Sequence, residues 1–280
     1  MTYKEIWQRI DRCCAYGEGE AKAVARILLD DMFCLSLTDI LCGAVEQLAP
    51  EAVQRLESAV ARLEKGEPVQ YVTAVAPFCG RTFHVEPGVL IPRPETEQLC
   101  RLAVGAVAAT PHARVLDIGT GSGCIAATIA LECPEAEVEA CDISTDALRI
   151  AAANARRLGA DVRFRLQDAL SLPDDTDRWH LVVSNPPYIC RSEESGMERN
   201  VLSYEPHLAL FVPDDAPLLF YRAIARYAAR ALKPGGWLMF EINPLYAAVT
   251  EDMLRSEGFA AVETIKDIYG KERNTICRRQ

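Results

Sequence analysis

The chain has 280 residues, of which 50% are apolar and 25% are charged, and its formal net charge is −10. Such a length favours two domains over one, and the acidic balance argues against broad electrostatic binding to nucleic acid. The sequence contains no run of about 18 apolar residues, and its first ten residues lack the apolar core of a secretory signal. We therefore expect a cytoplasmic protein that has no membrane partner.

The eleven cysteines do not follow a disulfide or metal-binding pattern. None of them forms a C-x-x-C pair, and only four histidines accompany them. Since we expect no export, reduced and mostly buried thiols are the better interpretation, and no metal site is predicted.

The first 66 residues predict a small helical bundle. Apolar residues recur at helical spacing from Ile6 to Cys14, from Ala21 to Met32 and from Val53 to Leu63. Four residues are predicted to begin or end these helices: Gly17 as a C-cap, Thr38 as an N-cap, Pro50 at a first helical turn and Gly66 at a helix end.

The pattern changes between Pro68 and Val85, where alternating apolar residues favour extended structure. A turn at Cys79-Gly80-Arg81 would make this stretch a β-hairpin. We therefore predict three parts: a helical domain over residues 1–66, a linking hairpin over 67–92 and a larger domain over 93–280.

From about Leu99 onward, strand and helix patterns alternate, which implies a parallel sheet. The fold class predicted is α/β, with a Rossmann-like sheet. A turn at Lys233–Gly236 should feed the fifth strand, and a final antiparallel hairpin should complete the sheet. The predicted strands are Val115–Ile118, Val138–Asp142, Val162–Leu166, Leu181–Ser184, Trp237–Ile242, Ala261–Ile265 and Thr275–Arg278.

A glycine-rich turn follows the first strand of this sheet and precedes a helix over Cys124–Leu131. Glycines at such a turn allow a ligand to approach the backbone at the helix N-terminus. The spacing lacks the third glycine position of the dinucleotide fingerprint, and nothing in the chain suggests hydride transfer, which disfavours an NAD enzyme. The residues of the turn are Gly119, Thr120, Gly121, Ser122 and Gly123.

Polar residues end three later strands of the same sheet. Asp142 could bind ribose hydroxyls, or it could equally cap the helix that begins near Ser144. Asp168 follows the third strand and Asn185 follows the fourth. Because parallel strands end at one edge, we expect these side chains to share that edge with the glycine turn.

The segment Asn185-Pro186-Pro187-Tyr188 ends the fourth strand. Two prolines cannot donate to a sheet ladder, so the strand stops and the Asn185 amide is held on stiff backbone. Its oxygen and the Pro186 carbonyl are two acceptors suited to a planar NH2 group. The motif resembles the signature of methyltransferases that act on amide or exocyclic amine nitrogens; the alternative is a rigid turn.

Together, these features resemble the class I S-adenosylmethionine-dependent methyltransferases. The resemblance implies that the glycine turn lies along the methionine and ribose part of the cofactor, with Asp117 organising it near the amino group. Asp142 would hold the ribose hydroxyls and Asp168 the adenine amine, and Ala169 would contribute a weak or purely backbone contact to adenine. Asn185 would make at most a minor cofactor contact.

Further segments closely resemble the bacterial release-factor glutamine methyltransferase family over essentially the whole chain. The most specific part is Pro92–Glu97, which reads Pro-Arg-Pro-Glu-Thr-Glu and ends the matching stretch Val89–Glu97. Residues 78–83, 185–188, 204–210 and 241–242 accompany it. The resemblance implies methylation of the side-chain amide nitrogen, N5, of the glutamine in the Gly-Gly-Gln motif of class 1 peptide chain release factors. The product would be S-adenosylhomocysteine, and the helical domain would dock the release factor.

The residue types of the motif account for this chemistry. As the amide nitrogen attacks the methyl group, positive charge grows on nitrogen, and hydrogen bonds to Asn185 and Pro186 should strengthen. Pro187 and Tyr188 would complete the acceptor site, with Tyr188 packing beside the amide and facing the cationic donor.

The chain also departs from the family pattern. The family often has Glu-(Ile/His)-Gly-x-x-Gln where this chain has Glu241–Tyr246, so Asn243 and Tyr246 replace the glycine and the glutamine. These two positions are the only support for a non-enzymatic scaffold. Two enzymatic alternatives remain: an N6-adenine methyltransferase on DNA or RNA, which the charge and the lack of a target-recognition region disfavour, and a glutamine methyltransferase acting on a ribosomal protein.

Overall fold

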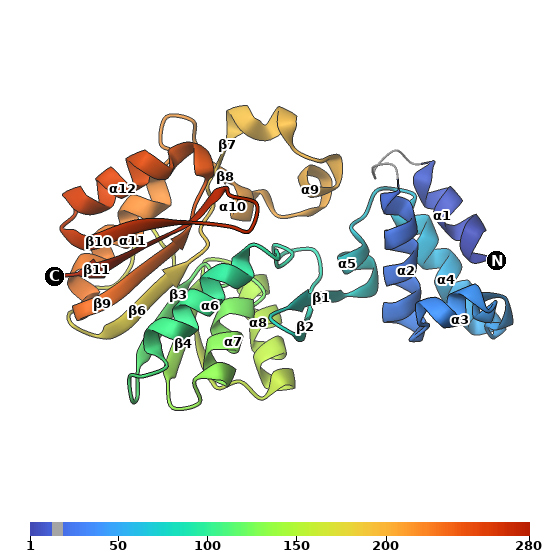
Figure 1. Ribbon diagram of the computed structural model, residues 1–280, viewed down its shortest axis with the longest axis horizontal. Coiled ribbons are helices and arrows are strands. Elements are labelled where there is room, and N and C mark those ends of the chain that lie inside the picture. Colours follow the sequence, from blue (N-terminus) through green and yellow to red (C-terminus); the bar gives the residue numbers. More distant parts are fainter. Residues whose placement is uncertain (13–18) are drawn as a thin grey trace. The chain divides into compact units, whose positions relative to one another are not determined.

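The computed structural model describes residues 1–12 and 19–280, which form two compact units (Figure 1). The first unit joins three stretches that are separate in the sequence: Met1–Ala76, Val85–Pro87 and Gly196–Glu205. The second unit comprises Pro77–His84, Gly88–Ser195 and Pro206–Gln280.

The first unit is a helical bundle, as its apolar stripes predict. Its core is built from the buried faces of these helices, including Ile6, Leu28 and Leu56, which are all 0% exposed. The Tyr204 hydroxyl donates to the Lys65 carbonyl at 3.0 Å, so a helix from late in the sequence belongs to this unit. The helices are α1 (Tyr3–Asp11), α2 (Glu20–Phe33), α3 (Leu37–Leu41), the 3₁₀ turn η1 (Ala44–Gln47), α4 (Pro50–Leu63), α5 (Val69–Thr73) and α9 (Arg199–Tyr204).

Two of the predicted helix ends can be compared with the structure in detail. Pro50 is the first residue of α4, as predicted, because its missing N–H would have no helical partner there. The N-cap of α3 is Ser36, whose hydroxyl accepts from the Asp39 N–H, so the prediction of Thr38 was wrong. The predictions that concern Cys14 and Gly17 lie outside the described residues.

The prediction of extended structure from Pro68 onward was also wrong at its start, because Val69–Thr73 forms helix α5. The β-branched residues there favour a strand locally. Tertiary packing overrides that preference: Val69 and Val72 enter the core of the bundle, and the Arg62 guanidinium donates to the carbonyls of Tyr71 and Val72.

The predicted hairpin is confirmed over β1 (Val75–Phe78) and β2 (Arg81–His84). Cys79 and Gly80 form its turn with φ angles of 47° and 70°. Two consecutive positive φ values match the right-handed twist of paired strands, and Gly80 adopts its value without the strain that a side chain would cause.

The second unit contains a seven-stranded sheet in the order β10-β11-β9-β6-β3-β4-β5. Strands β9, β6, β3, β4 and β5 are parallel, and the antiparallel hairpin β10–β11 completes the edge, as predicted. The strands are β3 (Arg114–Ile118), β4 (Glu137–Asp142), β5 (Val162–Leu166), β6 (Trp179–Ser184), β9 (Leu232–Glu241), β10 (Phe259–Lys266) and β11 (Glu272–Arg279).

One predicted turn is absorbed into this sheet. Residues 233–236 belong to β9 rather than preceding it. The pairing of β6 with β9 jumps from Trp179–Leu232 to Leu181–Trp237, so these residues bulge out of the ladder. The glycines permit this, with Gly235 at φ 76°.

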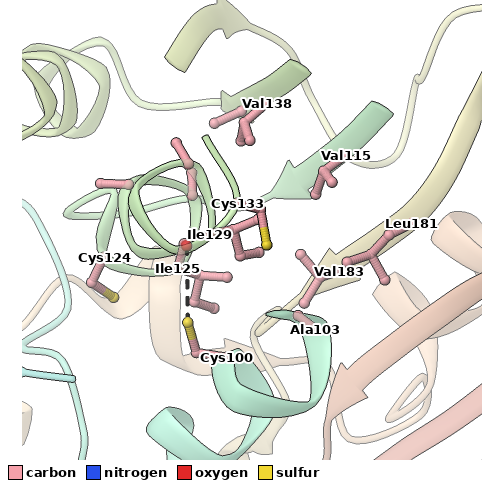
Figure 2. Packing of buried hydrophobic residues seen from close by; sticks show 14 of the residues in the cluster. Cys100, Ala103, Val115, Cys124, Ile125, Ile129, Cys133, Val138, Leu181 and Val183 are labelled. Atoms are coloured by element: carbon pink, nitrogen blue, oxygen red, sulfur yellow. Dashed lines mark hydrogen bonds between the residues drawn. The ribbon is translucent and has the colours of Figure 1, made fainter. Parts of the chain in front are cut away.

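Helices cover both faces of the sheet. Val115, Leu181 and Val183 face α6 (Thr96–Val107) and α7 (Cys124–Glu132), whose apolar side chains meet them in Figure 2. Residues that alternate with them, such as Leu116 and Val182, face α11 (Leu219–Ala231) and α12 (Ala247–Ser256). The remaining elements are α8 (Thr145–Leu158), β7 (Ile189–Cys190), η2 (Arg191–Gly196), α10 (His207–Leu210), β8 (Phe211–Val212) and η3 (Pro244–Tyr246).

The order of the strands creates a switch point between β3 and β6. The chain runs outward from β3 through β4 to β5 and then returns to β6 on the other side of β3. Connections leave these two strands in opposite directions, which opens a crevice at their carboxyl ends. The Ser184 hydroxyl bonds the Ile118 carbonyl at 2.6 Å and ties the two strand ends together there.

Of the helices formed by residues 1–12 and 19–280, none combines the length and apolar character that a bilayer crossing requires. Nine cysteines lie in the same ranges; all nine are free thiols, and six are buried.

Candidate active site

A cleft of about 230 Å³ opens at the carboxyl edge of the sheet, at the switch point. The glycine turn, Asp142, Asp168 and Asn185 all line it, so the structure brings together residues that the sequence spreads over more than sixty positions. Its walls are largely apolar. Val89, Leu90 and Leu208 belong to segments that carry the family resemblance but were assigned no contact in the cleft, and Phe220 and Ile224 were not singled out in the sequence.

The glycine turn keeps one side of its backbone open. Gly119 and Gly121 line the cleft with φ angles of 73° and 55°. A Cβ placed on either glycine would meet no atom of the described chain within 4 Å, so this space is available to a ligand. Gly123 has a different role, because a Cβ there would stand 2.9 Å from the Ala151 Cβ; it allows α7 to pack closely on α8.

Asp142 joins the glycine turn to the next helix. Its Oδ2 accepts from the Gly121 N–H and its Oδ1 from the Ser144 N–H, both at 2.9 Å. Helix α8 is capped by Ser144, whose own hydroxyl accepts from the Ala147 N–H. Burial raises the pKa of Asp142, and backbone donors, including those of Ser144 and Gly121, oppose that rise. Each carboxylate oxygen can accept a further hydrogen bond from a ligand in the cleft.

Asp117 lies beneath the glycine turn rather than in the cleft lining. It is 0% exposed, and its Oδ2 accepts from the Thr120 hydroxyl at 2.7 Å, which fixes the turn from below. Its buried Oδ1 accepts no hydrogen bond from the residues that the structure describes. Burial raises the pKa of Asp117 to about 7. Thr120 and Ser122 are themselves 5% and 3% exposed.

Residues that follow β5 form another wall of the cleft. Asp168 Oδ1 accepts from the Leu170 N–H at 2.8 Å, which turns the chain so that Asp168, Ala169 and Leu170 all line the cleft. Ala169 also packs against the core around α11, so its small side chain leaves this wall open.

Asn185, Pro186 and Pro187 line the cleft next to the glycine turn. Asn185 Nδ2 donates to the Thr96 hydroxyl at 3.2 Å. Tyr188 points elsewhere: its hydroxyl donates to Glu241 Oε1 at 3.0 Å, and it packs against the core around α11.

Glu241 was assigned no role from the sequence, yet its carboxylate accepts hydrogen bonds from two residues of this site, Thr96 and Tyr188. It ends β9 and is 1% exposed. Its Oε2 accepts from the Thr96 hydroxyl at 2.6 Å, while its Oε1 accepts from Tyr188. Burial raises the pKa of Glu241, and these two hydroxyl donors oppose the rise. A buried carboxylate requires such partners, so the signal in the sequence is an acidic residue that ends an apolar strand.

Asn243, one of the departures from the family pattern, forms a clamp on the segment after Pro187. Its Nδ2 donates to the Tyr188 carbonyl at 3.2 Å and to Glu193 Oε1 at 3.0 Å. Its Oδ1 accepts from the Leu245 N–H at 3.0 Å. Tyr246, the other departure, places its hydroxyl 3.2 Å from the Cys190 sulfur. Asn243 therefore bonds the last residue of the Asn-Pro-Pro-Tyr segment, and both replacements bond residues that follow it.

The hydrogen bonds of the Asn243 side chain should stabilise the fold. Asn243→Ala should lower the free energy of unfolding by about 1–3 kcal/mol, because two acceptors lose their donor and the Leu245 N–H loses its acceptor. Asn243→Asp keeps the bond to Leu245 but sets a second carboxylate against Glu193, so it should be at least as destabilising. Urea unfolding followed by circular dichroism measures both variants, and wild-type stability of Asn243→Asp would contradict this account.

The comparisons with known proteins agree with this geometry. The Methyltransferase small domain model matches residues 81–202, and the PrmC N-terminal domain model matches residues 9–73. A release factor glutamine methyltransferase of Bacteroides thetaiotaomicron is 46% identical over 94% of this chain and 95% of its own length. One of Geobacter sulfurreducens is 40% identical over 98% of both chains.

Solved structures share the fold at lower identity. A Thermus thermophilus 16S rRNA methyltransferase, solved with AdoMet and guanosine, has a TM-score of 0.53 and 20% identity over 74% of this chain and 50% of its own. A Pyrococcus furiosus methyltransferase has a TM-score of 0.51 and 17% identity over 82% of this chain and 99% of its own.

The parallel sheet with its glycine turn and switch-point cleft defines a class I methyltransferase, which uses S-adenosylmethionine. Identity of this extent to curated relatives, over nearly the whole chain, settles the family as well. The chain belongs to the release factor glutamine methyltransferases.

The residues present fit this cofactor. Open space beside Gly119 and Gly121 admits a ligand along the turn, and Asp142 offers carboxylate oxygens at the cleft. Apolar walls at Phe220 and Ile224 suit a heteroaromatic ring.

Proposed function

We propose that the protein transfers a methyl group from S-adenosylmethionine to N5 of the glutamine in the Gly-Gly-Gln motif of class 1 peptide chain release factors. The observation that carries the proposal is the position of Asn185 and Pro186, which line the same cleft as the glycine turn and Asp142. The accompanying product is S-adenosylhomocysteine, and the site of action is the bacterial cytoplasm.

The cofactor supplies an electrophilic methyl group when bound. In this proposal, Asp142 holds the ribose hydroxyls, the turn from Gly119 to Gly123 lies along the ribose and methionine part, and Asp168 with Ala169 receives the adenine. Asp117 acts through Thr120, which it holds at 2.7 Å. The buried carboxylate also favours positive charge nearby, because a cation lowers the cost of ionising it.

Asn185 Oδ1 and the Pro186 carbonyl are the proposed acceptors for the two N–H groups of the substrate amide. That nitrogen is a poor nucleophile, since its lone pair is delocalised into the carbonyl. Positive charge grows on it during attack, so hydrogen bonds to preorganised acceptors strengthen in the transition state. The same bonds aim the nitrogen at the methyl group. The methylated nitrogen then sheds its proton to water without a strong general base.

Pro187 and Tyr188 support these acceptors in different ways. Pro187 stiffens the backbone that presents Pro186. Tyr188 is tied to Glu241 at its hydroxyl and to Asn243 at its carbonyl, so we assign it the role of fixing the segment.

We propose that the helical domain, residues 1–66, docks the release factor, with the hairpin over 67–92 as the linker and residues 93–280 performing the transfer. The family model over residues 9–73 supports this division. The net charge of −10 gives no support to direct binding of nucleic acid.

The decisive assay supplies methyl-labelled cofactor with a release factor, a ribosomal protein, DNA or RNA as acceptor. We expect label in the release factor, and mass spectrometry should map one added methyl group to the Gly-Gly-Gln glutamine. Methylated adenine with an unmodified release factor would favour an N6-adenine methyltransferase. A labelled ribosomal protein with an unmodified release factor would favour a glutamine methyltransferase that acts on ribosomal proteins.

The cofactor assignment predicts that Asp142→Ala weakens binding of S-adenosylmethionine. Each charge-assisted hydrogen bond to a ribose hydroxyl is worth about 1.5–3 kcal/mol, so affinity should fall at least tenfold by calorimetry. Asp161→Ala, at an exposed position, is the matched control and should bind normally. Unchanged affinity in a folded Asp142→Ala variant would refute the assignment.

A further inference from the structure

Two hydrogen bonds connect three side chains, from Asn185 at the proposed acceptor site to Glu241 in the core. Asn185 Nδ2 donates to the Thr96 hydroxyl at 3.2 Å, and that hydroxyl donates to Glu241 Oε2 at 2.6 Å. The three residues come from different elements: the end of β6, the start of α6 and the end of β9. Only the tertiary fold brings them together, because the bonded partners are 89 and 145 positions apart in the sequence.

The burial of Thr96 and Glu241 determines which group donates in each of these two hydrogen bonds. Thr96 is 3% and Glu241 1% exposed, so bulk water does not compete for their polar atoms. An ionised carboxylate can only accept, and a threonine hydroxyl has one proton. Thr96 therefore gives its proton to Glu241 and offers Asn185 only a lone pair. The Asn185 amide must then turn its NH2 toward Thr96, which directs Oδ1 away from it.

The other oxygen of Glu241 keeps the carboxylate in place. Tyr188 donates to Oε1 at 3.0 Å, so both oxygens are bonded and the carboxylate cannot rotate freely. Because Tyr188 and Asn185 belong to one short segment, Glu241 holds that segment at two points.

We infer that Thr96 and Glu241 are positioning residues that fix the polarity of the Asn185 amide, so that it presents an acceptor to the substrate. The inference rests on the proposed function, in which Asn185 Oδ1 receives an N–H of the substrate glutamine. An amide that is free to flip would also present its NH2, which repels the NH2 of glutamine and attracts a carboxylate. Thr96 and Glu241 therefore contribute to selection of glutamine over glutamate.

Four variants test this inference. Thr96→Val keeps the shape but removes the hydroxyl, and Thr96→Ser restores it. Glu241→Gln keeps the shape but can donate as well as accept. Thr250→Val is the matched control, since the Thr250 hydroxyl is buried and has no hydrogen-bond partner in the described part of the chain. Thermal unfolding and cofactor affinity are measured for each, to establish that it is folded.

Turnover is then measured with a release factor, together with inhibition by the same factor carrying glutamate in place of the acceptor glutamine. We expect Thr96→Val and Glu241→Gln to lose about tenfold in kcat, the effect of one net hydrogen bond. Cofactor affinity should stay within about twofold, a margin below that of one hydrogen bond. The glutamate factor should become a better inhibitor of both variants, because a flipped Asn185 can donate to its carboxylate. Thr96→Ser should recover most of the activity, and Thr250→Val should match the wild type.

The outcomes separate this inference from the proposed function. A wild-type enzyme that does not methylate the release factor would remove the proposed function itself. An unimpaired Asn185→Ala variant would leave that function standing but would remove the role of Asn185, and with it the inference. If Asn185 matters but Thr96→Val and Glu241→Gln keep wild-type kcat and wild-type rejection of the glutamate factor, the inference is overturned. Equal loss in Thr96→Ser and Thr96→Val, with no gain in inhibition, would reduce Thr96 to a packing role and would also overturn it.

Discussion

Replacing Asn185 with alanine is expected to lower turnover by about 10²–10³ at saturating substrates, the usual effect of losing one preorganised transition-state hydrogen bond. The side chain lines the cleft from the end of β6, and its NH2 group is already engaged by Thr96. Its oxygen is the part that a substrate amide would use, so the loss should fall on kcat.

The measurement is single-turnover kinetics with labelled cofactor and a release factor, alongside calorimetry of cofactor binding. Cofactor affinity should change little, because Asn185 is assigned at most a minor contact to the cofactor. The Thr250→Val variant provides a folded control with a buried polar group removed elsewhere. A fall in turnover of less than about tenfold would contradict the assigned role, since even one ordinary hydrogen bond is worth that much.

The second large effect concerns the acceptor. A release factor with glutamate in place of the Gly-Gly-Gln glutamine should not be methylated, and discrimination should be on the order of 10⁴ or more. Glutamate has no N–H groups for the Asn185 and Pro186 oxygens, so buried acceptors would face a carboxylate that repels them. The nucleophilic nitrogen is absent as well.

Competition experiments distinguish recognition from the missing nucleophile. The glutamate factor should inhibit methylation of the normal factor only through surfaces remote from the cleft, so its inhibition should be insensitive to the acceptor residue. A factor with alanine at the acceptor position is the matched control and should inhibit about equally. Much stronger inhibition by the glutamate factor than by the alanine factor would show that the cleft binds a carboxylate. That result would contradict the proposal that Asn185 Oδ1 and the Pro186 carbonyl act as hydrogen-bond acceptors there.

The two departures from the family pattern also bear on function. Asn243 and Tyr246 could have suggested a scaffold that no longer turns over. In the structure, however, they bond Tyr188, the last residue of the Asn-Pro-Pro-Tyr segment, and residues that follow it, and neither lines the cleft. Asn243 reaches the Tyr188 carbonyl with its side-chain amide, so it holds the segment by a contact that a glycine could not make.

Much of this protein was determined by the sequence alone. The five parallel strands of the large sheet, the glycine turn and the helix after it were predictable, because buried parallel strands are short apolar runs that end in polar or glycine-rich turns. The edge that carries Asp142, Asp168 and Asn185 was predictable for the same reason: parallel strands in one sheet end on one side. The motif itself pointed to an NH2 acceptor, because two prolines leave Asn185 on rigid backbone.

Other features depended on contacts that local sequence does not record. Val69–Thr73 reads as extended but folds as a helix, because its apolar side chains complete the bundle core. Residues 196–205 join the first unit from late in the chain. The bonds from Glu241 through Thr96 to Asn185 span three elements, and only the packed sheet brings them within hydrogen-bond distance. Sequence patterns specify which face of each element is buried. The hydrogen-bond partner of a buried polar group depends instead on which distant elements pack against it in the tertiary structure.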